Sequence, residues 1–386
     1  MGNNDKRPKI RFKGFNDDWE QHKVSEITNF HKQGFYTTES YNDEKKYYLL
    51  RGTDLTENKL ILKDTPKINA TEKDYQAFKA QIGDFLIVRS GTVGTYGIVY
   101  EDIPAIFGSY LIDFRFNKNQ VINEFFGYFY QSDLFKNQLK MIIQQSANTN
   151  INAENIKSTF IKLPSLAEQK KISDYFQNID HLISLHQRKL EKLGNIKKSM
   201  LEKMFPKDEN KVPEIRFKGF NDDWEQHKVS KEVYSVDTGK SKYNILEIGK
   251  YEILGSTGII GYDDSYDYEG DFLLTARVGA NAGTLYRHSG KVKITDNTVF
   301  LQGNHIDFVF YLLDKFDLKK LSFGSGQPLI KASELKAIEL YIPKNSEEKN
   351  KITKYFISID KLISLHQRKL EKLKNIKKAC LEKMFV

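Results

Sequence analysis

Apolar residues recur at alternating three- and four-residue steps in two long stretches of the chain, Ile179–Phe205 and Ile359–Phe385. This spacing places them along one face of a helix and predicts an apolar seam. The seam of the first stretch contains Ile179, Ile183, His186, Leu190 and Leu193, and that of the second contains Ile359, Ile363, His366, Leu370 and Leu373. We interpret the two histidines as packed or register-setting polar residues. Because no proline falls between positions 167 and 205, we expect a helix of roughly 57 Å at about 1.5 Å per residue.

The two stretches have nearly the same sequence. They differ at His181/Lys361, Gly194/Lys374, Ser199/Ala379 and Met200/Cys380. The segment Ile10–Ser25 is also repeated, without change, as Ile215–Ser230. This internal duplication divides the chain into two halves, each with an opening segment, a body and a long helix. We expect the bodies within residues 1–164 and 207–343, and spacer helices over 165–206 and 344–386 that pack on each other.

The patterns within the two bodies predict mixed α/β structure. The strands expected in the first body are Tyr47–Leu50, Phe85–Arg89, Ile98–Tyr100 and Tyr110–Phe116. Those expected in the second are Tyr251–Leu254, Phe272–Arg277, Gly283–Arg287, Lys291–Ile294 and Thr298–Leu301. Helical spacing predicts helices at Asn123–Leu139 and Ile306–Leu318. The bodies align weakly but in the same order, which sets Arg51 opposite Gly255.

Charge and cysteine content narrow the class of protein. The 386 residues carry a formal net charge of +9, and most of the surplus lies in the helical regions, +3 over 165–206 and +7 over 344–386. A nucleic-acid partner and a solvated, lysine-rich helix face account for this equally well. A single cysteine excludes a disulfide framework, and we interpret Cys380 as a small core residue. The sequence shows neither a signal peptide nor an apolar run of membrane-spanning length, so we expect a cytoplasmic protein.

The sequence lacks the motifs of enzymes that act on nucleic acids or bind nucleotides. Its eight prolines never occur in tandem, which excludes the Asn-Pro-Pro-aromatic motif of amino-methyltransferases. The Gly239–Ser241 segment resembles the end of a phosphate loop, but the required earlier glycine is replaced by Tyr234. The histidines show no paired metal-ligand spacing. We therefore expect neither a self-sufficient active site nor a metal site.

Each body instead offers a strand that runs into a glycine-rich turn with an arginine, Arg89 in the first and Arg277 in the second. Arginine can bridge guanine O6 and N7 with two hydrogen bonds, and Asn148 or Gln327 could read adenine in the same way. The alternative is that these are turn residues with solvated side chains. The candidate DNA-binding residues are Arg51, Thr53, Arg89, Ser90, Thr92, Asn148, Thr149, Asn150, Ser256, Thr257, Arg277, Asn281, Ser325 and Gln327.

Over essentially its whole length the chain resembles the specificity subunit of Type I restriction–modification systems. The resemblance is carried by the two LISLHQRKLEKL helices and the DDWEQHKVS openings. It also rests on the YEILGSTGIIGY, GDFLLTARVGANAG and TDNTVF segments of the second body; the first body matches more loosely.

The resemblance implies that 1–164 and 207–343 are two target-recognition domains, each reading one half of a bipartite, asymmetric DNA target. The helices would pair as an antiparallel coiled coil with pseudo-twofold symmetry. Two methyltransferase subunits and restriction subunits would dock on this chain. These partners would use S-adenosylmethionine, ATP and Mg, whereas this chain would bind no cofactor and catalyse nothing.

Two other classes of protein share some of these sequence features. A non-catalytic coiled-coil DNA-binding or regulatory scaffold would also have long, lysine-rich helices, but it would not need two α/β bodies at matched positions. A single-chain nuclease–methyltransferase would need the cofactor and catalytic motifs that the sequence lacks.

Overall fold

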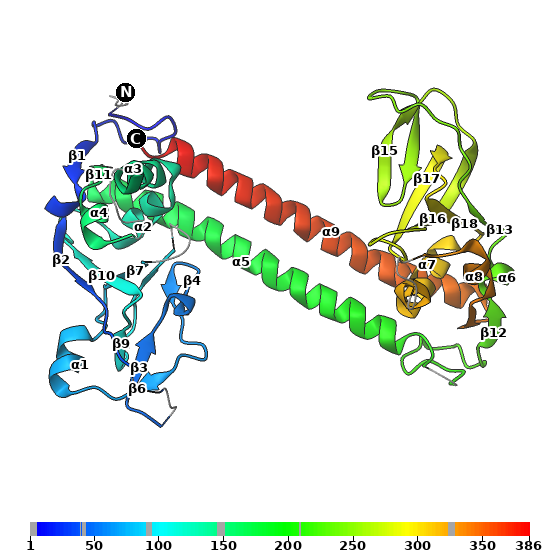
Figure 1. Ribbon diagram of the computed structural model, residues 1–386, viewed down its shortest axis with the longest axis horizontal. Helices are drawn as coiled ribbons and strands as arrows, with labels where there is room; N and C mark the ends of the chain where they lie inside the picture. Colours follow the sequence, from blue (N-terminus) through cyan, green and yellow to red (C-terminus); the bar gives the residue numbers. More distant parts are fainter. Residues whose placement is uncertain are drawn as a thin grey trace. The chain divides into compact units, whose positions relative to one another are not determined.

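The chain folds into two compact units, one formed by Met1–Gln187 with Arg368–Val386 and the other by Arg188–Gln367. The structure is a computed structural model that describes residues 6–38, 40, 44–89, 95–144, 151–207, 210–322 and 329–386. The boundaries between the units fall inside the two long helices, α5 (Leu166–Lys203) and α9 (Ser346–Lys383) (Figure 1). Each unit therefore contains one body together with part of both helices.

The long helices have the length that the apolar spacing predicts, with 38 residues each. Side chains satisfy backbone donors at their first turns: Ser165 Oγ accepts from Glu168 N, and Asn345 Oδ1 accepts from Glu347 N at 2.8 Å. All ten seam residues are at least partly buried. Ile179 and Ile359 are fully buried, and Ile183 and Ile363 pack against the cores of their own units.

The body of the first unit has a six-stranded sheet in the order β2-β10-β7-β8-β5-β4, beside a three-stranded sheet in the order β6-β3-β9. In the larger sheet the strands are Thr28–Gln33, Leu111–Phe116, Phe85–Val88, Tyr96–Ile98, Lys59–Leu60 and Leu55–Thr56; in the smaller sheet they are Lys67–Ile68, Tyr47–Leu50 and Ala105–Phe107. Strand β1 (Glu20–Lys23) pairs with β11 (Phe160–Leu163). The helices are α1 (Glu72–Phe78), α2 (Asn123–Gln131), α3 (Asp133–Gln144) and α4 (Ala153–Lys157), with 3-10 turns η1 (Val24–Glu26) and η2 (Gly52–Asp54).

The body of the second unit has one six-stranded sheet in the order β13-β18-β16-β17-β14-β15. These strands are Ser235–Thr238, Thr298–Gln302, Tyr268–Ala276, Leu285–Ile294, Tyr251–Gly255 and Gly258–Asp263. Strand β12 (Glu225–Lys228) pairs with β19 (Glu339–Ile342) as β1 does with β11. The helices are α6 (Val229–Glu232), α7 (Ile306–Phe316) and α8 (Ala332–Ala337), with the 3-10 turn η3 (Leu318–Ser322).

The structure bears out the mixed α/β expectation and corrects three of the expected elements. The strand expected at Ile98–Tyr100 is instead β8, Tyr96–Ile98. The stretch predicted as one helix, Asn123–Leu139, is two helices, because Ser132 is extended and its hydroxyl accepts from Phe135 N to begin α3. The two strands predicted at Gly283–Arg287 and Lys291–Ile294 lie in one strand, β17, which continues past Gly290 at a φ of +126°. Glycine adopts that backbone conformation without a steric penalty.

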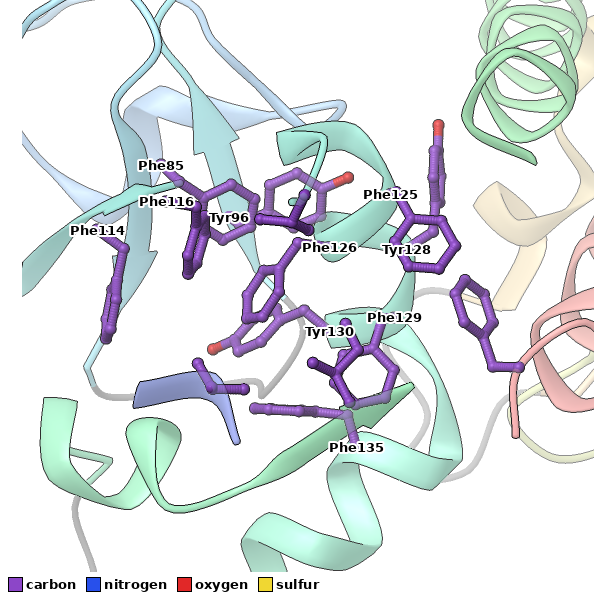
Figure 2. Close-up of a cluster of buried hydrophobic side chains, with 14 of the residues drawn as sticks. Phe85, Tyr96, Phe114, Phe116, Phe125, Phe126, Tyr128, Phe129, Tyr130 and Phe135 are labelled. Carbon is purple, nitrogen blue, oxygen red and sulfur yellow. The ribbon is translucent and has the colours of Figure 1, made fainter. Parts of the chain in front are cut away.

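Aromatic side chains fill the core of the first body. Figure 2 shows rings from β7, β8, β10, α2 and α3 converging between the sheet and the helices. The labelled residues are Phe85, Tyr96, Phe114, Phe116, Phe125, Phe126, Tyr128, Phe129, Tyr130 and Phe135. Phe85 stacks on Tyr96 at 4.7 Å and meets Phe126 edge-on at 5.4 Å between ring centroids. Such pairs add to the free energy gained by removing apolar area from water.

A partly buried carboxylate, 21% exposed, joins the body of the first unit to both long helices. Asp180 of α5 lies 2.7 Å from the Lys377 ammonium of α9 and accepts from the Tyr128 hydroxyl of α2 at 3.0 Å. Lys377 Nζ also lies over the Tyr128 ring at 5.5 Å. Burial, and the Asp180 carboxylate beside it, raise the pKa of Tyr128. The hydroxyl therefore stays protonated and donates a hydrogen bond to Asp180.

The second unit repeats this joint with equivalent residues. Asp360 of α9 lies 2.8 Å from Lys197 of α5 and accepts from the Tyr311 hydroxyl of α7 at 2.7 Å. Within each unit the segments of α5 and α9 run antiparallel, because Phe176 stacks on Phe385 while Asp180, further along α5, meets the earlier residue Lys377. A continuous coiled coil along the full helices stays a prediction.

The repeated opening segments bind the ends of the long helices. In the first unit Arg11 makes two hydrogen bonds to Glu168 near the start of α5, and Ile10 N donates to Lys383 O at the end of α9. In the second unit Arg216 does the same with Glu348, and Ile215 N donates to Lys203 O. The opening segment is therefore repeated because each unit has the same helix ends to hold.

We expect Arg11→Ala to destabilise the first unit by about 3–5 kcal/mol, because the Glu168 side chain is 1% exposed and would stay buried without its ion-pair partner. Urea unfolding, followed by Trp19 fluorescence in a Trp224→Phe background, measures this loss. Arg7→Ala is the matched control, since the Arg7 pair with Asp18 is 61% and 46% exposed and should contribute less than about 1 kcal/mol. Equal losses from the two variants would contradict the assignment.

Candidate nucleic-acid interface

Three connections of the second body meet at one end of its sheet. Arg277, which follows β16, donates its backbone N–H to Asn297 O at 2.9 Å, and Asn297 lies in the turn between β17 and β18. Ser256, after β14, donates its hydroxyl to the same carbonyl at 3.2 Å. The Arg277 guanidinium reaches Asp296 O at 3.5 Å. The structure thus brings two predicted residues, Ser256 and Arg277, to one place.

The glycine-rich turn after Arg277 folds over the same end of the sheet. Gly279 and Gly283 both have a φ of +84°, and a Cβ on Gly283 would lie 2.9 Å from Lys319 N. Other residues are strained there, so glycine is required. Asn281 is exposed in this turn, and Thr257 is exposed in the turn after β14. Lys320, exposed on η3 and not foreseen from the sequence, adds a charge suited to a phosphate.

The segment predicted to carry Ser325 and Gln327 lies outside the described residues. The residues that follow it do return to the glycine-rich turn: Ile330 N donates to Arg277 O at 2.7 Å, and Leu329 forms a bridge with Val278. This pairing places Leu329 and Ile330 beside Arg277 and Val278.

In the first body the predicted Arg51 is held by neighbouring acceptors. Its Nη2 donates to Asp64 O at 3.0 Å, and its Nε lies 3.7 Å from the Asp54 carboxylate. Asp54 is 1% exposed, accepts from Arg51 N at 2.7 Å and accepts from the Thr65 hydroxyl. Thr53 is exposed beside it and Arg89 is half-buried. The other predicted residues of this body, Ser90, Thr92, Asn148, Thr149 and Asn150, lie outside the described residues.

One backbone arrangement recurs at this end of both sheets. A four-residue turn, Gly108–Leu111 in the first body and Thr295–Thr298 in the second, is held by equivalent hydrogen bonds; we name it the tip turn. The backbone N–H of its first residue donates to Leu50 O in the first body and to Leu254 O in the second. The N–H of its last residue donates to the carbonyl of its first residue. The carbonyl of its third residue accepts from Arg89 N in the first body and from Arg277 N in the second. These bonds make Arg89 equivalent to Arg277 and Arg51 equivalent to Gly255.

Two glycines allow the edge strands to reach the tip turns. Gly34 N donates to Leu111 O, and Gly239 N donates to Thr298 O, at 3.0 and 2.9 Å. A Cβ on Gly34 would lie 2.1 Å from Gly108 O, and one on Gly239 would lie 2.3 Å from Thr295 O. No side chain fits in that space, so the backbone itself closes this end of each sheet.

Several residues of this interface were not identified from the sequence. Tyr110 and Asn297 occupy the third position of the two tip turns, and Tyr110 is 70% exposed. Tyr36, two residues after Gly34, is 74% exposed. The sequence signal for Tyr36 and Tyr110 was an aromatic residue close to a glycine. No sequence pattern showed that Tyr110 and Asn297 occupy the same position of equivalent turns, because the two bodies are only weakly similar.

The first body also has a buried acidic cluster, near Asp84, at the opposite end of β7 from Arg89. Arg115 donates to Asp84 at 2.7 Å and lies 3.3 Å from Asp113, which is fully buried. Burial, reinforced by the neighbouring Asp84 carboxylate, raises the pKa of Asp113 to about 8. This cluster is separated from the candidate interface by the length of the strand and has a structural role.

Within the part of the chain that the structure describes, no group of three or more His, Cys, Asp or Glu side chains could hold a metal ion. No helix there is long and apolar enough to cross a membrane. The tip turns and the residues beside them carry hydrogen-bonding groups from arginine, asparagine, hydroxyl and backbone.

Known proteins share this architecture. A family model described as the Type I restriction modification DNA specificity domain matches residues 16–195 and 221–375. A Methanocaldococcus jannaschii protein provisionally named the specificity subunit of the type I restriction enzyme MjaX is 26% identical over 400 residues, 94% of this chain and 91% of that protein. The MjaVIII specificity subunit of the same organism is 28% identical over 297 residues, 68% of this chain and 69% of its own. The crystal structure of a type I restriction–modification S subunit from M. genitalium superposes with a TM-score of 0.68, covering 98% of this chain and 99% of that subunit. At 16% identity, this match shows a common fold.

We expect the stability of the first unit to fall as the pH rises from about 4 to 8. The folded protein holds the Asp113 proton with a pKa near 8, above the ordinary 3.8, so this contribution is present below pH 4 and lost on the way to pH 8. Each pH unit costs at most about 1.4 kcal/mol. Urea midpoints across this range should change less in Asp113→Asn than in the parent. Parallel profiles in the two proteins would contradict the assignment.

Proposed function

Because the chain belongs to the Type I restriction modification DNA specificity family, we propose that each body reads one half of a bipartite DNA target and that the two halves differ in sequence. The observation that carries this proposal is the tip turn, which is built identically in both bodies but carries different side chains. A common backbone would hold the same place in the major groove, while different side chains would select different bases.

The predicted residues would divide into two roles on the DNA. Arg89 and Arg277 begin the glycine-rich turns and have the geometry to form two hydrogen bonds with guanine. Thr53, Ser256, Thr257 and Asn281, with the nearby Lys320, are suited to sugar and phosphate oxygens. The second role fixes the position of the body on the duplex and carries no sequence information directly.

The two long helices would act as a spacer and as the docking site for partner subunits. Asp180–Lys377–Tyr128 and Asp360–Lys197–Tyr311 make the same joint twice, from nearly identical helix sequences. Identical surfaces bind identical partners, so we infer two equivalent sites, each for one methyltransferase subunit. Restriction subunits would join that assembly. S-adenosylmethionine, ATP and Mg would bind to the partners, and this chain would supply specificity without catalysis.

Mass measurement of the complex co-expressed with its methyltransferase should give two methyltransferase chains for each copy of this chain. The equivalent leucines Leu182 and Leu362, 41% and 45% exposed on α5 and α9, allow each site to be tested alone. Leu182→Asp or Leu362→Asp should remove one methyltransferase, and the double variant both, because the charge would be buried at the contact. Methyl transfer by this chain alone, or a stable complex of the unsubstituted chain with only one methyltransferase, would refute the proposal.

Arg277→Ala should weaken binding of the complex to its target by about 1–3 kcal/mol if the arginine reads guanine. The loss should be confined to one base pair of one half-site, as measured by competition with single-base variants of the target. Arg277→Lys, which keeps the charge but not the two-donor fork, should lose the same base preference. An equal loss on every sequence, with a smaller dependence on salt, would instead assign Arg277 to a phosphate.

A further inference from the structure

The fold does not constrain which side chain occupies the third position of the tip turn in each body. This residue is Tyr110 in the first body and Asn297 in the second. The backbone carbonyl of each accepts from the backbone N–H of the equivalent arginine at 2.9 Å. Resting on the proposed function, we propose that this position is a specificity determinant of each half-site, with Asn297 reading adenine and Tyr110 reading a different base.

The backbone of the turn does not require either residue. Among the described residues, the non-glycine residues with positive φ are Glu57, Asn58, Asp64 and Asp317. Asn297 is therefore not retained for a left-handed conformation, the usual structural reason for asparagine in a turn. The hydroxyls of Thr295 and Thr298 lie 3.1 Å apart and connect the two ends of the second turn without the Asn297 side chain. A tyrosine and an asparagine in the same backbone frame differ in what they present outward.

The surroundings of Asn297 place it beside the predicted guanine reader. The Arg277 guanidinium reaches the carbonyl of Asp296, the preceding residue of the turn, at 3.5 Å. The Ser256 hydroxyl donates to the Asn297 carbonyl, which fixes the backbone and leaves the exposed side-chain amide for an outside partner. An amide offers one donor and one acceptor side by side, the pattern that matches adenine N7 and N6. Two readers this close would contact neighbouring bases.

Tyr110 offers different chemistry at the equivalent position. It is 70% exposed, a large value for an aromatic side chain. Its ring can contact the methyl group of thymine, and its hydroxyl can donate or accept a hydrogen bond at a base edge.

The test selects binding sites from a random DNA library with the whole complex, comparing the parent chain and Asn297→Asp. Aspartate has the size of asparagine and is equally suited to turns, but it can only accept hydrogen bonds. It should lose adenine at one position by about 5- to 150-fold and favour cytosine, whose N4 donates. The half-site read by the first body should stay the same. The reciprocal variant, Tyr110→Asn, should change only that other half-site.

Asn244→Asp is the matched control, because it makes the same chemical change near Asp263, at the end of β15 remote from Gly258. It should select the parent sequence. If Asn297→Asp and Tyr110→Asn also select the parent sequence, the tip turn does not determine specificity, although the proposed function stands. A parent complex that selects no bipartite sequence would instead refute the proposed function itself.

Discussion

The structure depends on one partly buried interaction that occurs twice: an aspartate of one long helix is held between a lysine of the other helix and a tyrosine of the body. A carboxylate withdrawn from water is costly unless its charge and its hydrogen-bonding capacity are both satisfied. Asp180 is satisfied only when α5, α9 and α2 are all in place, and Asp360 only when α9, α5 and α7 are. Each joint therefore couples the folding of a body to the pairing of the helices.

This constraint explains which parts of the chain are duplicated closely and which have diverged. The opening segments and helices form the joints and the helix ends, where Arg11 and Arg216 neutralise buried glutamates in the same way. The close identity of these segments fits the contacts that they make with one another at the joints and the helix ends. The bodies pack on the helices through buried aromatic residues. Some polar contacts at the joints differ: Asn58 donates to Asp180, whereas Arg287 approaches Asp360. Away from the joints, a body can change its loops without disturbing the helices.

The same separation of roles operates within each body. Backbone hydrogen bonds and close-packed glycines hold the tip turn, and these contacts do not depend on the side chains exposed at its tip. The frame can therefore keep its position while the exposed residues vary, which is what reading different DNA sequences requires. Among the described residues, the buried Asp84–Asp113–Arg115 cluster occurs only in the first body, so the scaffold also tolerates different side chains at the far end of the sheet.

The sequence alone determined the duplication, the two long helices and the mixed α/β bodies, because these depend on periodic apolar spacing and on identity between repeats. It also identified Arg277, Ser256 and the glycine-rich turn as candidates, since glycine and arginine at a strand end have a direct physical meaning. The tertiary structure alone decided that Asp180 and Asp360 join three elements each, because the partners are far apart in sequence. It also decided that Tyr110 and Asn297 are equivalent. Their turns share hydrogen bonds rather than residues, and hydrogen bonds between distant backbone groups leave no pattern in the sequence.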